Sequence, residues 1–146
     1  MKKQSISQRA MNFLARREHS VKELQTKLVK ANFDINEINE LIDKLQKSDL
    51  QSDQRFTENY LRYRSQRGFG SQRITQELKE RGIHSDLISE ALSEADIDWF
   101  SLAMTVRCKR FGEQSPEDFK DKAKQQRFLQ SRGFTHEQIT ESFNTD

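Results

Sequence analysis

The sequence predicts an all-α protein built from three tandem three-helix units, and the main observation behind this prediction is an internal repeat. Apolar residues recur in the same order in three copies, namely Leu24, Leu28, Phe33, Ile38 and Ile42, then Ile74, Leu78, Ile83, Ile88 and Leu92, then, more weakly, Leu129, Phe134, Ile139 and Phe143. The chain also holds only 5 Gly and 1 Pro, and no run of alternating β-branched residues indicates a strand. Small helical units bury their apolar faces by stacking, so the repeat favours a binding surface over a deep catalytic pocket.

The composition indicates a thin core. Hydrophobic residues make up 33% of the 146 residues and charged residues another 33%, which suits an elongated array with much surface per residue. The 10 Phe, many at periodic positions, argue against a disordered chain. The array form and the low apolar content favour a monomer.

The cysteine content and the absence of long apolar runs predict the compartment. The single cysteine, Cys108, excludes an internal disulfide and a multi-cysteine zinc site, and it indicates a reducing environment. The basic N-terminus has no apolar run long enough for a secretory signal, and no stretch approaches the roughly 20 apolar residues that span a bilayer. We therefore expect a soluble cytoplasmic protein without a membrane partner.

Local signals define where each helix begins and ends. Candidate N-caps are Ser20, Asp34, Ser71, Ser85, Ser115 and Thr135, and those at 20, 34 and 135 have the form of capping boxes. Candidate stops are Gly68, Gly70, Gly82, Gly112 and Gly133. The predicted helices are 5–17, 21–31 and 35–47, then 53–67, 72–81 and 85–96, then 98–111, 116–132 and 136–144. The corresponding domains are residues 1–50, 51–97 and 98–146.

Charge is unevenly distributed, although the formal net charge is only +2. Residues 55–73 carry five arginines against one glutamate, whereas residues 77–98 carry seven acids against two bases. Such a polarised middle unit suits partners of both signs. The arginines of helix 53–67 either keep the surface soluble or form a face that grips phosphates or carboxylates, since a planar guanidinium binds oxyanions in bidentate fashion.

The predicted helix 116–132 has a second basic face, made by the i, i+4, i+7 spacing of Lys120, Lys124 and Arg127. A solvated surface is the ordinary interpretation of this face. Contact with DNA backbone or an acidic partner is the alternative, supported by a neighbouring basic cluster at Arg107, Lys109 and Arg110. Three large residues are expected in the core rather than on a stacking platform, namely Trp99, Phe100 and Met104.

Features that resemble enzyme sites have simpler explanations. Arg16 and Arg17 end the first helix, where cations interact favourably with the negative end of its dipole. His19 is not expected to bind a metal, because no second His or Cys lies at ligand spacing. The pair Glu18 and His19 is not expected to catalyse acid–base chemistry, because neither a nucleophile nor a third catalytic group accompanies it. The turn 67–71 lacks the lysine and the strand of a nucleotide-binding loop, so Phe69 is expected to pack inward, although the helix that follows offers an anion site. We expect no catalytic residue and no metal site.

Three segments, LARREHSVKEL (14–24), YLRYRSQRGFGSQRITQELKERGI (60–83) and RFLQSRGF (127–134), resemble the RecX family of bacterial regulatory proteins. The blocks stand in the family's order and spacing, and the resemblance extends from about residue 8 to residue 143. It implies a curved array of three-helix units with no cofactor and no catalytic residue. It further implies a negative regulator of the RecA recombinase in the SOS response and in DNA repair and recombination.

By this resemblance the protein binds the RecA filament groove on single-stranded DNA, blocks filament growth and inhibits ATPase, strand exchange and co-protease activity. The positions of this sequence that match the three motifs of the family are Arg16, Arg17, Glu18 and His19 in the first, Tyr60, Arg62, Arg67, Gly68, Gly70, Arg73 and Ile74 in the second, and Arg127, Phe128, Arg132, Gly133 and Phe134 in the third. The residues expected to contact RecA or DNA are Arg16, Arg17, Arg62, Arg64, Arg67, Arg73, Lys124, Arg127 and Arg132. The third unit has the polar Gln125 at the position where the first two units have Leu24 and Ile74. This difference predicts that the third unit packs more loosely.

Two other function classes remain as alternatives. A helical module that binds DNA or RNA directly predicts tight binding to bare nucleic acid with a steep salt dependence, which the modest net charge disfavours. An enzyme is disfavoured because no triad, metal set or phosphate loop is present in the sequence.

Overall fold

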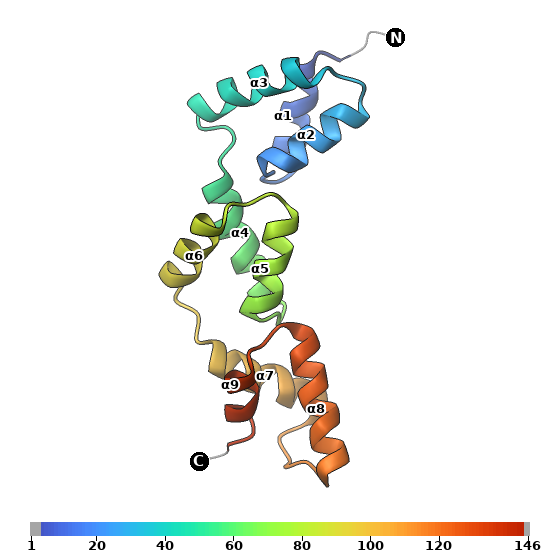
Figure 1. Ribbon diagram of the computed structural model, residues 1–146, viewed down its shortest axis with the longest axis vertical. Coiled ribbons are helices and arrows are strands. Elements are labelled where there is room, and N and C mark those ends of the chain that lie inside the picture. The colour runs from blue at the N-terminus through green and yellow to red at the C-terminus, as the bar shows by residue number, and fades with distance from the viewer. Residues whose placement is uncertain (1–3, 145–146) are drawn as a thin grey trace. The chain divides into compact units, whose positions relative to one another are not determined.

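The computed structural model describes residues 4–144, and all regular secondary structure within them is α-helical (Figure 1). The first unit contains α1 (Ile6–Arg16), α2 (Val21–Lys30) and α3 (Ile35–Lys47). The second contains α4 (Asp53–Gln66), α5 (Ser71–Glu80) and α6 (Ser85–Glu94). The third contains α7 (Trp99–Phe111), α8 (Phe119–Arg132) and α9 (His136–Glu141). The predicted all-α class and the three groups of three helices are confirmed, and no helix in this range is both long and apolar enough to span a bilayer.

The helix starts follow the predicted caps in part. Capping boxes at Ser20 and Thr135 are confirmed, and Ser5 forms a third with Gln8. Asp34 caps α3 as predicted, but the predicted capping box there is wrong, because its carboxylate accepts the N–H of Asn36. The prediction of a cap at Ser115 is wrong, because α8 begins three residues later and Asp118 accepts the N–H of Asp121. Residues 116–118 therefore precede the helix.

Two other predicted caps are displaced by one residue. Ser71 and Ser85 are the first residues of α5 and α6, and the helical bonds from Ile74 and Ile88 go to the carbonyls of the residues before them. At α6 the preceding residue is His84, whose Nδ1 accepts the N–H of Asp86 at 3.2 Å. A histidine ring there replaces the serine hydroxyl that the sequence suggested.

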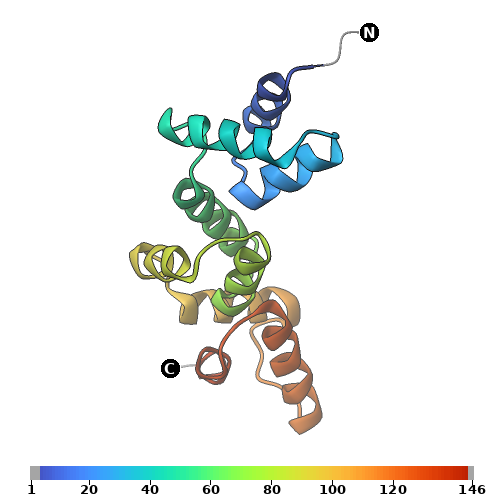
Figure 2. The same cartoon turned by 45° about the horizontal axis from the view of Figure 1, so that its top comes forward.

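Each terminal unit has its own apolar core. In the first unit the fully buried residues include Leu24, Leu28 and Ile38, with Phe13 and Phe33 packed against them. In the third unit Ala103, Leu129 and Phe134 form the centre, and Trp99 and Val106 pack around it. Figures 1 and 2 both show α7, α8 and α9 side by side. The middle copy of the repeat is buried as well, at Ile74, Leu78, Ile83 and Ile88, so the repeated apolar positions mark the core as predicted.

The chain forms two compact units, Met1–Tyr60 with Leu78–Ala91 and Leu61–Glu77 with Leu92–Asp146. The division therefore falls inside the second three-helix group. The domain boundaries at residues 50/51 and 97/98 stay a prediction from the sequence repeat.

Inside the first compact unit, the loop before α2 docks on the turn after α5. Ser20 Oγ donates a hydrogen bond to the carbonyl oxygen of Arg81 at 2.8 Å, and Lys22 Nζ donates to the carbonyl of Glu80 at 3.0 Å. A Cβ on Gly82 would stand only 2.7 Å from Lys22 Cβ, so this turn requires glycine both for space and for its φ of 79°.

Inside the second compact unit, the loop before α5 docks in the same way on the turn after α8. Gly70 N–H donates to the carbonyl of Arg132 at 2.8 Å, and Gln72 N–H donates to that of Gly133 at 3.0 Å. Arg73 Nη1 donates to the carbonyl of Ser131 at 3.0 Å, the position that matches Glu80 in the repeat. The same junction thus occurs twice along the chain and joins each three-helix group to the next.

Candidate partner-binding surface

Arg64 is fixed by a carboxylate and an aromatic ring. Its Nε and Nη2 atoms donate to the two carboxylate oxygens of Glu77, both at 2.8 Å, and both side chains are more than four-fifths buried. Its guanidinium carbon lies 3.8 Å from the centre of the Phe69 ring. This bidentate pair and the stacked ring fix the position of the Arg64 side chain.

Two further arginines, Arg73 and Arg132, stack on the ring of Phe69. We call Arg64, Arg73 and Arg132 around this ring the Phe69 arginine cluster. The guanidinium carbons of Arg73 and Arg132 lie 4.6 Å and 4.7 Å from the ring centre. Arg73 Nε also reaches Glu77 at 3.3 Å. Phe69 is half-buried beneath these guanidiniums, rather than simply packed inward as predicted.

Arg67 stands on a separate ring beside the cluster. Its guanidinium carbon lies 4.8 Å from the centre of Tyr63, whose side chain is 52% exposed. Arg132 also stacks on Phe128, at 5.1 Å. Across residues 4–144, neither Arg67 nor Arg132 forms an ion pair with a carboxylate.

The electrostatics of this region favour an added anion. One carboxylate, that of Glu77, serves two of the three cluster arginines, so the cluster keeps a positive excess. Stacking on aromatic rings fixes the guanidinium planes and leaves N–H edges directed away from the ring. Because the side chains are already held in place, binding an oxyanion costs less conformational entropy than it would with free arginines.

The other predicted cations on α4 and α8 lie in different surroundings. Arg62 is exposed on α4. Lys124 and Arg127 are exposed on α8 and line, with Lys120, a cavity of about 460 Å³ that is also lined by Glu117, Asp118 and Asp121. The acids there balance the bases, so this face lacks the positive excess of the Phe69 arginine cluster.

Arg16 and Arg17 belong to the other compact unit. Both are exposed, and Arg17 donates from Nη1 and Nη2 to the carboxylate of Glu23 at 3.0 and 3.2 Å. Burial works to raise the pKa of Glu23, but hydrogen bonds from Arg17 and the Ser20 N–H outweigh it and lower the pKa below its usual range. The nine residues predicted to contact a partner thus fall in both compact units, and their contact role stays a prediction.

His19 is a structural residue, as the sequence predicted. It is 1% exposed, its Nδ1 lies 3.0 Å from the carbonyl of Arg17, and its Nε2 lies 2.8 Å from Lys27 Nζ. Nδ1–H therefore donates to the carbonyl, and Nε2 accepts from the ammonium of Lys27. Burial lowers the pKa of His19, and the charges of Arg17 and Lys27 lower it further.

Two expectations about α7 are wrong. Arg107 is not part of an exposed basic cluster, because it is 2% exposed, donates from Nε to the carbonyl of Ser142 at 3.0 Å and stacks on Phe143. Phe100 is not a core residue, since it is 45% exposed. A buried arginine that caps a backbone carbonyl looks like a surface cation in the sequence, because its helical position alone does not reveal its partner.

The sequence also missed what holds the cluster together. Phe69 follows Arg64 by five residues and precedes Arg73 by four, and this local spacing was a detectable signal. Arg132 comes from the third unit and joins only through the repeated junction, which no local pattern reveals. No group of three or more side chains suited to holding a metal ion occurs among the residues that the structure describes.

Comparison with known proteins identifies the family. Family profiles match residues 8–45, 52–92 and 96–142, described as the first, second and third three-helix domains of RecX. Regulatory protein RecX of Mannheimia succiniciproducens is 43% identical over 134 residues, covering 90% of this chain and 88% of the relative. Its counterpart in Halorhodospira halophila is 38% identical over 136 residues, covering 93% and 84%.

Solved structures show the same fold. The crystal structure of RecX from Lactobacillus salivarius has a TM-score of 0.78 and 23% sequence identity, covering 94% of this chain and 91% of that one. A second crystal structure of regulatory protein RecX has a TM-score of 0.81 and 21% identity, covering 94% and 70%. The profiles span most of the sequence, and the relatives share more than a third of the aligned residues. The chain therefore belongs to the RecX family of regulatory proteins.

Proposed function

We propose that this protein is a negative regulator of the RecA recombinase. In this proposal it binds in the groove of the RecA filament on single-stranded DNA, blocks filament growth and so inhibits ATPase, strand exchange and co-protease activity. The observation that carries the proposal is the Phe69 arginine cluster with Arg67 beside it. Fixed guanidiniums, two of them without a carboxylate partner, suit an acidic protein surface or a phosphate backbone.

No chemical step is needed for this function. A protein that binds one state of the filament more tightly than another shifts the equilibrium by its differential affinity. The relatives are named as regulatory proteins, which agrees with a role without catalysis. We propose that the protein acts as a cytoplasmic monomer, which sedimentation equilibrium would check.

The test is RecA ATP hydrolysis on single-stranded DNA, titrated with this protein. We expect inhibition by the wild type and its loss in the triple variant Arg62→Glu, Arg67→Glu and Arg73→Glu, because the reversed charges repel the anionic partner. The matched control changes Lys30, Lys44 and Lys47 to Glu, which alters the net charge equally at exposed sites of α2 and α3. Both variants should keep the helical circular dichroism of the wild type.

The ratio of the two proteins distinguishes the mechanisms. Inhibition at far less than one molecule per RecA subunit supports action on growing filament ends, whereas inhibition only near equimolar supports groove coating. No inhibition at any ratio, with RecA still on the DNA, would overturn the proposal.

A second candidate, direct binding to DNA or RNA, rests on exposed Tyr63 with Arg67 stacked on it. An exposed ring beside arginines is the arrangement on which single-stranded bases stack. Binding to a bare oligonucleotide without RecA, lost in Tyr63→Ala, would favour this function. Binding that is weak or unchanged by the substitution would leave RecA as the main partner.

A further inference from the structure

A lysine and a histidine of the first compact unit lie together as a nucleophile lies beside its base. Lys27 Nζ is 2.8 Å from Nε2 of His19, and Nδ1 of His19 is 3.0 Å from the carbonyl oxygen of Arg17. The carbonyl fixes the ring proton on Nδ1, so Nε2 is the acceptor that faces the amine. An amine within hydrogen-bond reach of a base that a third group orients has the arrangement that activates side chains for covalent chemistry.

The surroundings of Lys27 hold its amine in place and leave a path to it. Nζ lies 5.0 Å from the centre of the Phe13 ring, and the centres of the Phe13 and His19 rings are 5.9 Å apart. Lys27 itself is only partly buried on α2. The amine is therefore held beside two rings, while a small solute can approach it from the surface.

The electrostatics favour the neutral, nucleophilic form of this amine. Burial lowers the pKa of Lys27, and the positive charges of Arg17 and Arg16 lower it further. Glu23 acts in the opposite direction, but its carboxylate accepts two hydrogen bonds from Arg17, at 3.0 and 3.2 Å. A lysine amine with a lowered pKa is a better nucleophile at neutral pH, because more of it carries a free lone pair.

The same charges select the reagent. Arg16 and Arg17 are both exposed, and their positive charges reach Lys27, so the approach to the amine favours an anion. An acyl phosphate combines an activated acyl carbon, an anionic leaving group and a small size. It therefore suits an amine that is held beside two rings and flanked by arginines.

We propose that Lys27 is a site of non-enzymatic acylation by acyl phosphates, with His19 as the proton acceptor. The lone pair of Nζ attacks the carbonyl carbon and forms a C–N bond, and the C–O bond to the phosphate breaks with its electron pair leaving on the phosphate. The proton that Nζ loses passes to Nε2 of His19 and then to the departing phosphate. The products are an N-acyl-lysine and inorganic phosphate, and the site goes beyond the proposed regulation of RecA.

Acylation removes the charge of this site and preserves its hydrogen bond. The acylated Nζ is neutral but keeps one N–H, which can still donate to Nε2 of His19. The buried ring therefore retains a donor, and the positive charge of Lys27 beside it is lost. We expect the modified protein to remain folded.

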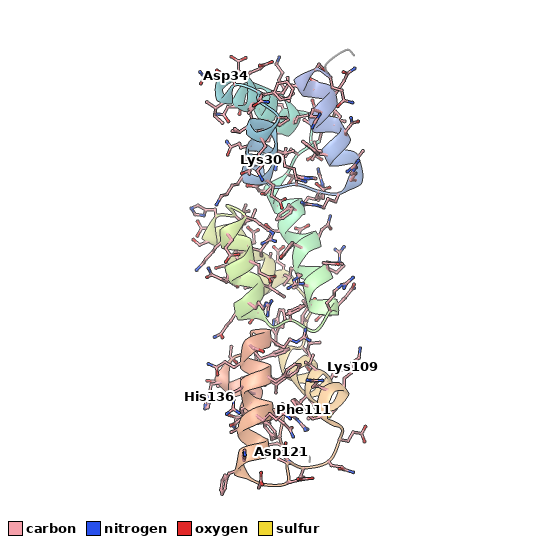
Figure 3. All side chains as sticks on the ribbon, turned by 90° about the vertical axis from the view of Figure 1, so that its right-hand side faces the viewer. Lys30, Asp34, Lys109, Phe111, Asp121 and His136 are labelled. Carbon is pink, nitrogen blue, oxygen red and sulfur yellow. The ribbon has the colours of Figure 1, made fainter. Side chains whose placement is uncertain are left out.

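Mass spectrometry of the full-length chain incubated with acetyl phosphate tests this proposal. The matched internal control is Lys30, the last residue of the same helix, which is exposed (Figure 3). We expect Lys27 to be acetylated about fivefold faster than Lys30 or more, because its base and its lowered pKa both raise the reactivity of the amine. His19→Gln and Arg16→Gln should each slow acetylation of Lys27 and leave that of Lys30 unchanged.

Two comparisons show whether the fold creates this reactivity. His136→Gln changes an exposed histidine of α9 and should leave the rate at Lys27 unchanged. In concentrated urea the wild-type rates at Lys27 and Lys30 should become equal, because unfolding separates the amine from His19. The urea comparison needs no substitution, so it tests the proposal even if circular dichroism shows that His19→Gln is unfolded.

Three outcomes contradict parts of the proposal. Equal rates at Lys27 and Lys30 in the folded wild type would overturn it altogether. An unchanged rate at Lys27 in a folded His19→Gln variant, or a preference for Lys27 that persists in urea, would overturn the role of His19. An unchanged rate at Lys27 in Arg16→Gln would overturn the choice of an anionic donor.

Discussion

At the scale of single residues, partners decide what a charged side chain does. Three arginines illustrate this. Arg17 forms an ion pair on the surface, Arg64 forms a bidentate pair that is largely buried, and Arg107 is buried and donates to a backbone carbonyl. The sequence predicted arginine-rich surfaces but not these differences. A guanidinium reaches several possible partners, and which one it finds depends on neighbours that are distant in sequence.

Because His19 is buried, we expect acid to destabilise the first three-helix unit. Its pKa lies below the ordinary value of 6.5 because of burial, so the unfolded chain binds a proton more readily than the folded one. The contribution to stability is therefore complete above about pH 6.5 and is lost as the pH falls below it. Protonation also places a second cation against Lys27, 2.8 Å away.

The measurement is the melting temperature at pH 7.5 and pH 5. We expect a lower value at pH 5 for the wild type and for the control His136→Gln, whose ring is exposed. The variant His19→Gln should be less stable at pH 7.5 but should show a smaller difference between the two pH values. An identical pH difference in His19→Gln would show that other groups cause the effect.

At the scale of elements, helix identity was predictable and helix connections were not. All nine predicted helices overlap a helix of the structure, because the 3.6-residue apolar pattern and the polar breaks are local signals. The start of α8 was misplaced, since Ser115–Pro116 has the composition of a helix start while Asp118 provides the actual cap. The junction made by Gly70 and Gly133 joins residues far apart, so only the three-dimensional structure reveals it.

Gly70→Ala tests this junction by steric contact alone. A Cβ at this position would stand 2.4 Å from the carbonyl oxygen of Gly133, and the backbone of Gly70 does not have a positive φ. We expect the substitution to lower the free energy of unfolding by about 1–3 kcal/mol, the usual cost of overpacking. Chemical denaturation would measure it, with Ser71→Ala as a neighbouring control that should change stability by less than about 0.5 kcal/mol.

We expect the folded protein to become more stable when Gln125 is replaced by an apolar residue. It is 3% exposed, and its Oε1 has no hydrogen-bond donor within the described residues, whereas the matching positions hold the fully buried Leu24 and Ile74. Gln125→Leu should stabilise the protein by about 1–3 kcal/mol, because it removes an unsatisfied buried acceptor. The exposed control Gln114→Leu should have little effect, and a loss of stability in Gln125→Leu would mean that its bond to Asp121 dominates.

At the scale of the whole molecule, charge distribution matters more than net charge. The formal charge is only +2, yet the Phe69 arginine cluster and Arg67 concentrate guanidiniums beside a single Glu77. The family could be predicted from the sequence because its three motifs stand in order. The cluster could be predicted only in part, because Arg132 enters it from another three-helix unit.

A binding surface of this kind predicts sensitivity to salt. Raising ionic strength from about 50 mM to about 200 mM should weaken the inhibition of RecA, because mobile ions screen or replace exposed charge contacts. The triple variant at Arg62, Arg67 and Arg73 should lose most of this dependence, while the triple lysine variant should retain it. A wild-type inhibition that is independent of salt would argue for an apolar interface.

The repeated junction also determines where the chain tolerates cutting. A fragment that ends at residue 97 would contain three helices of the second group, yet it would leave the N–H groups of Gly70 and Gln72 without the carbonyls of Arg132 and Gly133. Ser20 and Arg81 impose the same condition on a fragment that ends at residue 50. Sequence repeats and units of stability therefore do not coincide in this protein, and a proteolytic cut at a repeat boundary removes part of the support of the preceding group.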